Sequence, residues 1–276
     1  MNLAFAKMHG LGNDFVVIDE REHAYELSPQ TLAAIADRRT GIGCDQILFL
    51  LPADDASAAA RYRVANADGS EAEHCGNGIR CIAVYLRRAG EITDSVSVEI
   101  GDETYELTID SDGAVSVDMG MPRFEPKQIP LSRSAYAERY EAEFACGPLS
   151  FGAVSMGNPH AVIQVDDVET AAVAPIGTAV QASELFPQGV NVGFMQIVSP
   201  DHIRLRVFER GVGETRACGT GACAAMAIGR RWGVLGDRAT VELTGGDLAI
   251  AWPDNQTKRM TMTGPATFVF EGSIEL

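Results

Sequence analysis

An internal repeat constrains the fold of this chain more than any other feature of its sequence. Two segments align without a gap, and each places two arginines, a valine and a glutamate ahead of a Cys-Gly-x-Gly motif. In both copies the arginines precede the motif cysteine by 14 and 12 positions, the valine by 11 and the glutamate by 4. The motif cysteines, Cys75 and Cys218, lie 143 positions apart. A repeat of that period has the size of a domain, so the chain is predicted to consist of two homologous halves.

A second pair of matching segments extends the repeat toward the N-terminus. A Gly-Asn pair at residues 12–13 precedes an apolar run at 15–18, and another at 157–158 precedes a run at 161–165. These pairs are 145 positions apart, close to the spacing of the cysteines. The repeat therefore covers most of the chain.

Each half has the periodicity of β-strands around one helix. Alternating runs rich in β-branched residues predict half-buried strands over residues 95–100, 105–109, 114–119 and 202–208. The fold class expected is α+β, with two pseudo-symmetric domains, each a mostly antiparallel or mixed sheet wrapped around a central helix. Residues 121–130 form the predicted linker between the halves.

The predicted central helices begin at the two motifs. After Cys75, apolar residues recur at helical spacing from Ile79 to Leu86, with Arg80 off that face and Gly90 as a stop. After Cys218, residues 222–228 are small and apolar all round, which is typical of a fully buried helix.

Composition limits the possible partners. Asp and Glu outnumber Lys and Arg by 38 to 22, and the resulting net charge of −16 argues against nucleic acid or an anionic membrane. The N-terminus lacks the apolar region of a signal peptide, and no stretch approaches the about 18 apolar residues of a membrane span, so we expect a cytoplasmic protein. The six cysteines include no Cys-x-x-Cys pair, which disfavours a zinc ribbon.

The motif cysteines carry the predicted chemistry. A cysteine at the start of a buried helix lies where backbone N–H groups and the helix dipole favour negative charge, so a lowered thiol pKa is expected. If the two halves face each other, Cys75 and Cys218 flank one cleft from opposite sides. Inversion of a carbon centre needs such a pair, because one group removes a proton and the other delivers one to the opposite face. The helix starts would stabilise the charge that develops on the substrate, and the scheme requires no cofactor.

Plainer interpretations stand beside this one. A cysteine in an apolar region is usually a small buried hydrophobic residue, and we interpret four of them in this way: Cys44, Cys81, Cys146 and Cys223. Residues 71–75 combine Glu, His and Cys, but Ala217 occupies the position that matches His74, which disfavours a metal site. His160 follows an Asn-Pro pair and is equally compatible with a structural loop. The asparagines at the repeat-matched positions are either turn residues or polar groups lining the cleft.

Eight short motifs together resemble the diaminopimelate epimerase family. They occur in order as MHGLGNDF at 8–15, CDQ at 44–46, NADGS at 66–70, CGNG at 75–78, GNPH at 157–160, NVGF at 191–194, ERG at 209–211 and ACGTG at 217–221. The resemblance implies a cofactor-independent, metal-free enzyme that interconverts LL- and meso-2,6-diaminopimelate in lysine and peptidoglycan precursor biosynthesis. It also implies a homodimer, one domain of residues 1–120 with 265–276, and a second of residues 121–264.

The same resemblance implies roles for particular residues. Cys75 and Cys218 match the acid/base pair, one as thiolate and the other as thiol, and His160 and Glu209 match residues that assist them. The substrate contacts fall on Asn13, Gln46, Asn66, Gly76, Asn77, Asn158, Asn191, Glu209, Arg210, Gly219 and Thr220. Arg210 suits the carboxylate at the distal, non-reacting end of the substrate, since a guanidinium can bind it in a bidentate manner.

Three other function classes remain open from the sequence. A proline or hydroxyproline racemase uses paired cysteines on the same fold, but a cyclic imino acid would not need Arg210 and the asparagines. Isomerases of the phenazine pathway share the fold without the cysteine pair. A redox-responsive thiol protein or binding module would exchange no α-proton of an amino acid.

Overall fold

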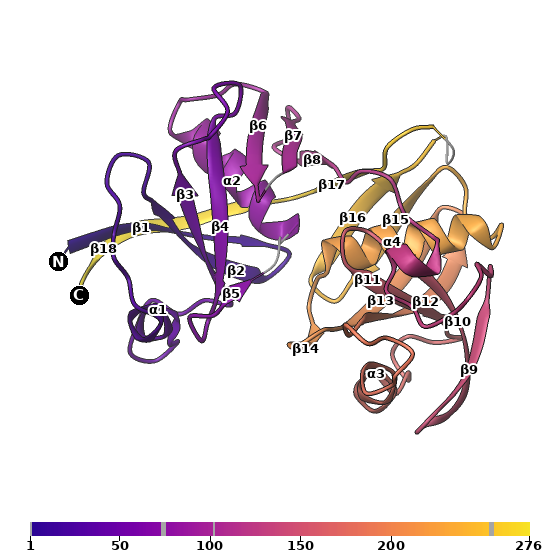
Figure 1. Ribbon diagram of the computed structural model, residues 1–276. Helices are drawn as coiled ribbons and strands as arrows, with labels where there is room; N and C mark the ends of the chain where they lie inside the picture. Colours follow the sequence, from indigo (N-terminus) through magenta and orange to yellow (C-terminus); the bar gives the residue numbers. More distant parts are fainter. Residues whose placement is uncertain (1, 73–75, 102, 254–256) are drawn as a thin grey trace. The chain divides into compact units, whose positions relative to one another are not determined.

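The computed structural model of the protein describes residues 2–72, 76–101, 103–253 and 257–276. The chain forms two compact units, Met1–Val117 with Gly264–Leu276 and Asp118–Thr263. Both chain ends belong to the first unit (Figure 1), because strand β1 (Asn2–Gly10) pairs antiparallel with strand β18 (Thr267–Glu275).

Residues 121–130 belong to the second unit, so the predicted linker at that place is wrong. The short 3-10 helix η1 (Pro126–Gln128) lies in this stretch. Ile129 is fully buried and packs in the apolar core that contains Phe151 and Phe194. Burying such a side chain removes apolar surface from water, which holds the stretch against the second unit.

The sheet of the first unit runs β18–β1–β2–β3–β4–β6–β7–β8, with the short strand β5 beside the end of β4. The β2–β3 and β4–β6 pairs are parallel, and the other pairs are antiparallel. Helix α1 (Pro29–Ala36) connects β2 to β3, and helix α2 (Gly76–Arg88) connects β5 to β6. The strands not yet delimited are β2 (Asn13–Asp19), β3 (Gln46–Leu51), β4 (Ala60–Asn66), β5 (Glu71–Ala72), β6 (Ser95–Ile100), β7 (Glu103–Ile109) and β8 (Val115–Asp118).

The second unit repeats this topology. Its sheet runs β9–β10–β11–β12–β13–β15–β16–β17, with β14 beside β13, and its parallel pairs are β11–β12 and β13–β15. Helix α3 (Val173–Gln181) corresponds to α1, and helix α4 (Gly219–Arg231) to α2. The strands are β9 (Tyr140–Phe144), β10 (Gly147–Ser155), β11 (Pro159–Gln164), β12 (Asn191–Ser199), β13 (His202–Glu209), β14 (Gly213–Thr215), β15 (Arg238–Leu243), β16 (Gly246–Ala251) and β17 (Thr261–Gly264). The predicted fold class and the four predicted strands are confirmed.

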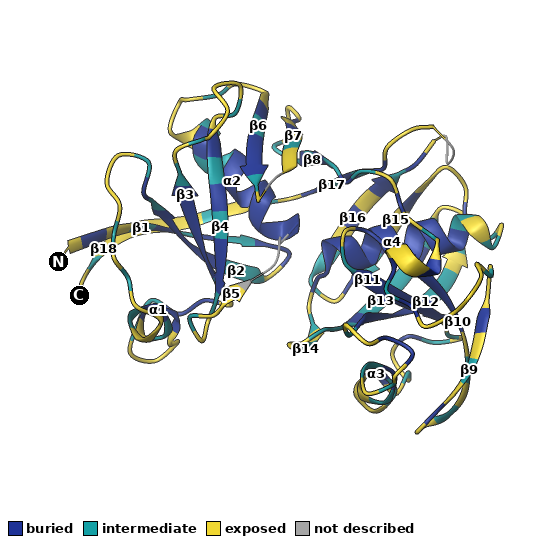
Figure 2. Ribbon diagram, in the orientation of Figure 1, coloured by how far each residue is buried: buried dark blue, intermediate teal, exposed yellow. Residues whose placement is uncertain are grey.

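Each sheet wraps around one helix. Helix α2 packs against β1, β2, β7 and β18, and helix α4 against β10, β11, β12, β13, β15 and β16. All residues of α4 from Gly219 to Gly229 are buried, which Figure 2 shows as dark blue over most of the helix. Small side chains permit this close packing, because a larger one would overlap the surrounding strands. The prediction of a fully buried second helix is confirmed.

Helix α2 corrects one expectation. Ile79, Ile82 and Leu86 form its buried face as predicted, but Arg80 is also fully buried instead of lying toward solvent. Its guanidinium donates to the carbonyl oxygens of Gly76 and Pro265, so the charge is buried with hydrogen-bond partners. The sequence period marks Arg80 as polar, but the sheet covers that side of the helix as well.

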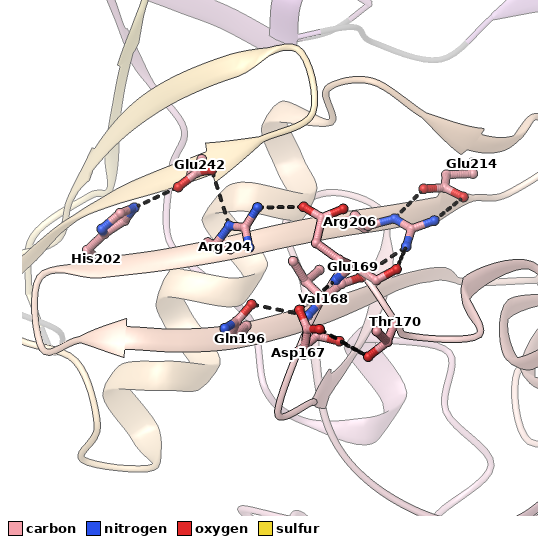
Figure 3. Close-up of polar contacts among 10 residues, drawn as sticks. All are labelled: Asp167, Val168, Glu169, Thr170, Gln196, His202, Arg204, Arg206, Glu214 and Glu242. Atoms are coloured by element: carbon pink, nitrogen blue, oxygen red, sulfur yellow. Dashed lines mark hydrogen bonds and ion pairs between the residues drawn. The ribbon is translucent and has the colours of Figure 1, made fainter.

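The arginines of the repeat lie on the outer face of their strands, away from the central helix. In the second unit Arg204 pairs with Glu169 and Glu242, and Arg206 binds Glu214 with two hydrogen bonds (Figure 3). In the first unit Arg61 pairs with Asp54. These pairs explain the repeated arginines structurally, since alternate residues of a strand point to opposite faces.

The cysteines outside the motifs follow the plainer interpretation with one exception. Cys44, Cys81 and Cys223 are buried, but Cys146 is exposed, because it lies in the turn between β9 and β10. Within the described parts of the chain, no helix is long and apolar enough to cross a membrane.

Candidate functional site

The candidate residues of the first unit gather at one edge of its sheet. Asn13 begins β2, Gln46 begins β3 and Asn66 ends β4. Strands β2 and β3 are parallel and β3 and β4 are antiparallel, so these ends lie side by side, with Gln46 directly opposite Asn66. Gln46 Nε2 donates to Asn66 Oδ1 at 3.2 Å, and Asn66 Nδ2 donates to Ser70 Oγ at 3.1 Å.

The start of helix α2 lies against this edge. Gly76 and Asn77 form its first turn, and both are buried. Asn77 Nδ2 donates to Asn13 Oδ1 at 3.2 Å, which joins the helix start to the strand. Cys75, the predicted acid/base group of this half, falls outside the described residues, as do Glu73 and His74 of the metal alternative. Among the residues that are described, no cluster of three or more His, Cys, Asp or Glu could hold a metal ion.

The second unit gathers its candidate residues at the equivalent edge. Asn158 directly precedes β11, Asn191 begins β12 and Glu209 ends β13. These positions match those of Asn13, Gln46 and Asn66 in the first unit. Cys218 is the N-cap of helix α4, and its Sγ accepts a hydrogen bond from the backbone N–H of Gly221 at 3.3 Å. Gly219 and Thr220 form the first turn of the helix.

The Cys218 thiol is held in its protonated form. Burial raises its pKa well above the ordinary value, and the negative charge of nearby Glu209 raises it further. Hydrogen bonds from Thr220 and from the Gly221 N–H act in the opposite direction but are outweighed. The expectation of a lowered thiol pKa is therefore wrong for Cys218. The helix start favours the thiolate, yet the loss of solvent around a fully buried sulfur costs more.

Glu209 is the carboxylate beside Cys218. Burial raises its pKa above the ordinary value, although hydrogen bonds with Thr215 and Cys218 lower it in part. The Thr215 hydroxyl donates to Glu209 Oε1 from strand β14. Glu209 and Cys218 therefore titrate as an interacting pair, because each group affects the pKa of the other.

His160 is a buried member of the same edge, not a loop residue. It lies in β11 and is 1% exposed. Burial, followed by the positive charge of Arg210, lowers its pKa to about 3, so the imidazole is neutral near pH 7. His160 Nε2 lies 2.8 Å from Asn158 Oδ1, and Asn158 Nδ2 donates to Thr220 Oγ1 at 3.4 Å. An amide oxygen only accepts, so Nε2 carries the proton.

Arg210 is fixed at the same edge by its backbone and its side chain. Its backbone N–H donates to Asn191 Oδ1 at 2.8 Å, and its Nη1 donates to the Gln188 carbonyl at 2.7 Å. Gly189, with φ +74°, leaves the space for the arginine stem, because a β-carbon there would stand 2.6 Å from Arg210 Cδ. A larger residue at position 189 would overlap the arginine stem, so Gly189 helps to hold Arg210 in this position.

Sequence reasoning missed several residues that hold the predicted ones. In the first unit Arg80 and Asp45 contact the asparagines, and in the second Thr215 and Gln188 bind Glu209 and Arg210. Asp45 lies inside the CDQ motif and Arg80 three residues after Asn77. Their positions inside or next to the motifs were the one sequence feature that could have identified them as supporting residues.

Comparison with solved structures defines the class of fold that carries these two half-sites. A hydroxyproline epimerase from Agrobacterium vitis superposes with a TM-score of 0.71 at 14% identity, over 99% of this chain and 92% of that chain. A phenazine biosynthesis protein from Bacillus anthracis superposes with a TM-score of 0.69 at 15% identity, over 100% of both chains. The chain therefore has the two-unit fold of these proteins.

Sequence comparison identifies the family within that fold. The profile described as Diaminopimelate epimerase matches residues 5–125 and 152–269. The chain is 52% identical over 278 residues to a diaminopimelate epimerase of Thioalkalivibrio sulfidiphilus, and 49% identical over 279 residues to one of Alkalilimnicola ehrlichii, with 100% of each chain covered. The chain belongs to the diaminopimelate epimerase family, as its motifs predict.

Proposed function

We propose that the protein is an isomerase that interconverts LL- and meso-2,6-diaminopimelate without a cofactor, in lysine and peptidoglycan precursor biosynthesis. Family membership over the whole chain supports the substrate. The observation that carries the mechanism is the buried Cys218 at the start of the central helix, together with the repeat that gives Cys75 the matching position. Each unit thus supplies one cysteine.

The two cysteines act as a base and an acid on opposite faces of one carbon. In one direction the Cys75 thiolate takes the α-proton, and the Cys218 S–H delivers its proton to the other face. The raised pKa of Cys218 supports its assignment as the thiol that begins this cycle. In the reverse direction the roles exchange, because the Cys218 thiolate and the Cys75 thiol are left at the end of the first turnover.

The developing negative charge on the substrate needs stabilisation, because a proton next to a carboxylate is weakly acidic. Backbone N–H groups at the start of α4, from Gly219 and Thr220, are fixed donors for the reacting carboxylate. Glu209 and His160 assist by controlling the protonation of Cys218 and the orientation of Asn158.

The far end of the substrate is gripped without reacting. Arg210 presents a guanidinium to the distal carboxylate, while uncharged amides bind carboxylate and ammonium groups alike. These amides are Asn13, Gln46, Asn66, Asn77, Asn158 and Asn191. Proline and hydroxyproline lack a second carboxylate, so they leave Arg210 without a role.

The decisive experiment replaces each cysteine separately by alanine and measures epimerisation and α-proton exchange of LL-diaminopimelate in heavy water. Both variants are expected to lose epimerisation by at least about 10³-fold, since each removes one of two required proton-transfer groups. Near-native epimerisation by either variant would refute the two-base mechanism. Hydroxyproline is the matched substrate control, and exchange of its α-proton at a comparable rate would overturn the substrate assignment.

We also propose that the enzyme is a homodimer in the cytoplasm. The family resemblance supports both statements. Light scattering during size-exclusion chromatography tests the first, with twice the 29.5 kDa mass of one chain as the expected result.

A further inference from the structure

Arg80 is a fully buried arginine in the first unit, and the mechanism above does not use it. Its Nη2 donates to Asn77 Oδ1 at 2.9 Å, its Nη1 to the Gly76 carbonyl at 3.0 Å and its Nε to the Pro265 carbonyl at 3.3 Å. The first of these hydrogen bonds fixes the guanidinium to the side-chain amide of Asn77, a predicted substrate contact.

The hydrogen bonds of Arg80 continue as a chain through two amides. Asn77 receives a hydrogen bond from Arg80 on Oδ1 and donates from Nδ2 to Asn13 Oδ1 at 3.2 Å. Asn13 in turn donates from Nδ2 to the Asp45 carboxylate at 3.2 Å. The Arg38 guanidinium binds the other oxygen of Asp45 at 2.7 Å.

The two ends of the chain fix its direction. A guanidinium can only donate hydrogen bonds and a carboxylate can only accept them. Both amides between them must therefore present the oxygen toward Arg80 and the nitrogen toward Asp45. A flipped Asn77 would place its NH₂ group against Arg80, and a flipped Asn13 would place its oxygen against Asp45.

We propose that Arg80 and Asp45 are positioning residues that lock the side-chain amides of Asn77 and Asn13 in the orientation that binds substrate. The inference rests on the proposed function, in which both asparagines contact diaminopimelate. Gly10 of β1 supports it independently. A β-carbon at Gly10 would lie 3.2 Å from both Arg80 Nη2 and Asn77 Cβ, so the strand packs directly on this pair.

The second unit orients its matching amide by a different device. Asn158 corresponds to Asn13, but its Oδ1 faces neutral His160, and its Nδ2 donates to Thr220 of the helix. The bond between helix and strand thus runs in the opposite direction in the two units. Cys223 occupies the position that matches Arg80.

A double-mutant cycle tests the coupling. Arg80→Gln is expected to lower kcat/KM about 30-fold, mainly through KM, because it releases the orientation of a binding group. Arg80→Lys should recover part of the loss. In an Asn77→Ala background, Arg80→Gln should lower kcat/KM by less than about 2-fold, since its effect passes through Asn77. Arg87→Gln removes the same charge from the partly exposed last turn of α2, away from Asn77, and is expected to leave kcat/KM unchanged. Equal losses from Arg80→Gln in both backgrounds would overturn the proposal.

A second measurement does not depend on activity or on replacing a buried residue. Asp45→Ala acts at the exposed end of the chain and should shift the side-chain NH₂ resonances of Asn13 and Asn77 in NMR spectra, whereas Arg87→Gln should not. Resonances of Asn77 that stay unmoved in Asp45→Ala would refute the coupled chain. If the wild-type enzyme exchanged no α-proton of diaminopimelate, the proposed function would fail. The NMR result would still show whether Asp45 and Asn77 are coupled through their hydrogen bonds.

Discussion

At the scale of single residues, burial controls the chemistry of the second half-site. Cys218, Glu209 and His160 are each shifted toward their neutral forms by loss of solvent. The low-dielectric surroundings penalise charge on each group, so burial favours the thiol of Cys218 and the carboxylic acid of Glu209 but the unprotonated imidazole of His160.

Glu209→Gln is expected to lower the pKa of the Cys218 thiol. The substitution removes a negative charge that raises this pKa, while burial, the larger cause, keeps it above the ordinary value. The pH midpoint of the ultraviolet thiolate absorbance measures the change, with Cys218→Ser in the same background as the blank. Glu214→Gln, which removes a carboxylate paired with Arg206 on the outer face, should leave the midpoint unchanged. A higher midpoint in Glu209→Gln would contradict the assignment.

His160 should make the protein less stable as the pH falls. Its folded-state pKa of about 3 lies below the ordinary 6.5, so between these values the unfolded chain binds a proton that the folded chain does not. This residue alone should lower the free energy of unfolding by about 2 kcal/mol between pH 7 and pH 5. In His160→Gln, the free energy of unfolding measured with urea should depend less on pH than in the wild type. His23→Gln, at an exposed position, should keep the wild-type pH dependence. Identical pH dependence in wild type and His160→Gln would refute the assignment of this loss of stability to His160.

At the scale of elements, the ends of strands determine where the site forms. Asn66 ends β4, and the turn that follows must reverse the chain within a few residues to form β5. Gly69 has φ +83° and donates its N–H to the Asn66 carbonyl at 2.9 Å. A β-carbon at Gly69 would lie 2.7 Å from Pro29 Cα, so the turn also packs against the start of α1.

Gly69→Ala should destabilise the protein more than Gly113→Ala. Both glycines have positive φ, which costs about 1 kcal/mol for alanine, but Gly113 has open space around it. The overlap with the Pro29 backbone should add at least about 2 kcal/mol at Gly69. Urea unfolding measures both variants, and Gly113→Ala serves as the control for backbone strain. Equal destabilisation would show that the turn moves freely away from α1.

At the scale of the whole molecule, the chain returns at its end to complete the unit where it began. Strand β18 covers β1 with antiparallel pairs from Asn2↔Glu275 to His9↔Thr267. The second unit has its own apolar core. Both tryptophans of the chain, Trp232 and Trp252, belong to this second unit. The two units can therefore be monitored separately.

A chain that ends at Ala266 should lose stability in the first unit alone. Removing β18 leaves β1 without its outer partner and exposes apolar side chains that β18 covers. Urea unfolding followed by far-ultraviolet circular dichroism should show a new transition at lower urea. Tryptophan fluorescence should keep the wild-type midpoint, because Trp252 is fully buried in the second unit. An equal shift in both signals would show that the two units unfold as one.

The sequence by itself determined the repeat, four of the strands, the two central helices and, through the resemblance of its motifs, the family. The strands and helices follow from local patterns, because periodicity records which face of an element is buried. Only the tertiary structure decided the burial of Arg80, the exposure of Cys146, the place of residues 121–130 and the raised pKa of Cys218. Those properties depend on which neighbours surround a group and how much water they exclude. A local pattern shows which residue is present, but the free energy of a charge or proton is set by residues distant in the sequence.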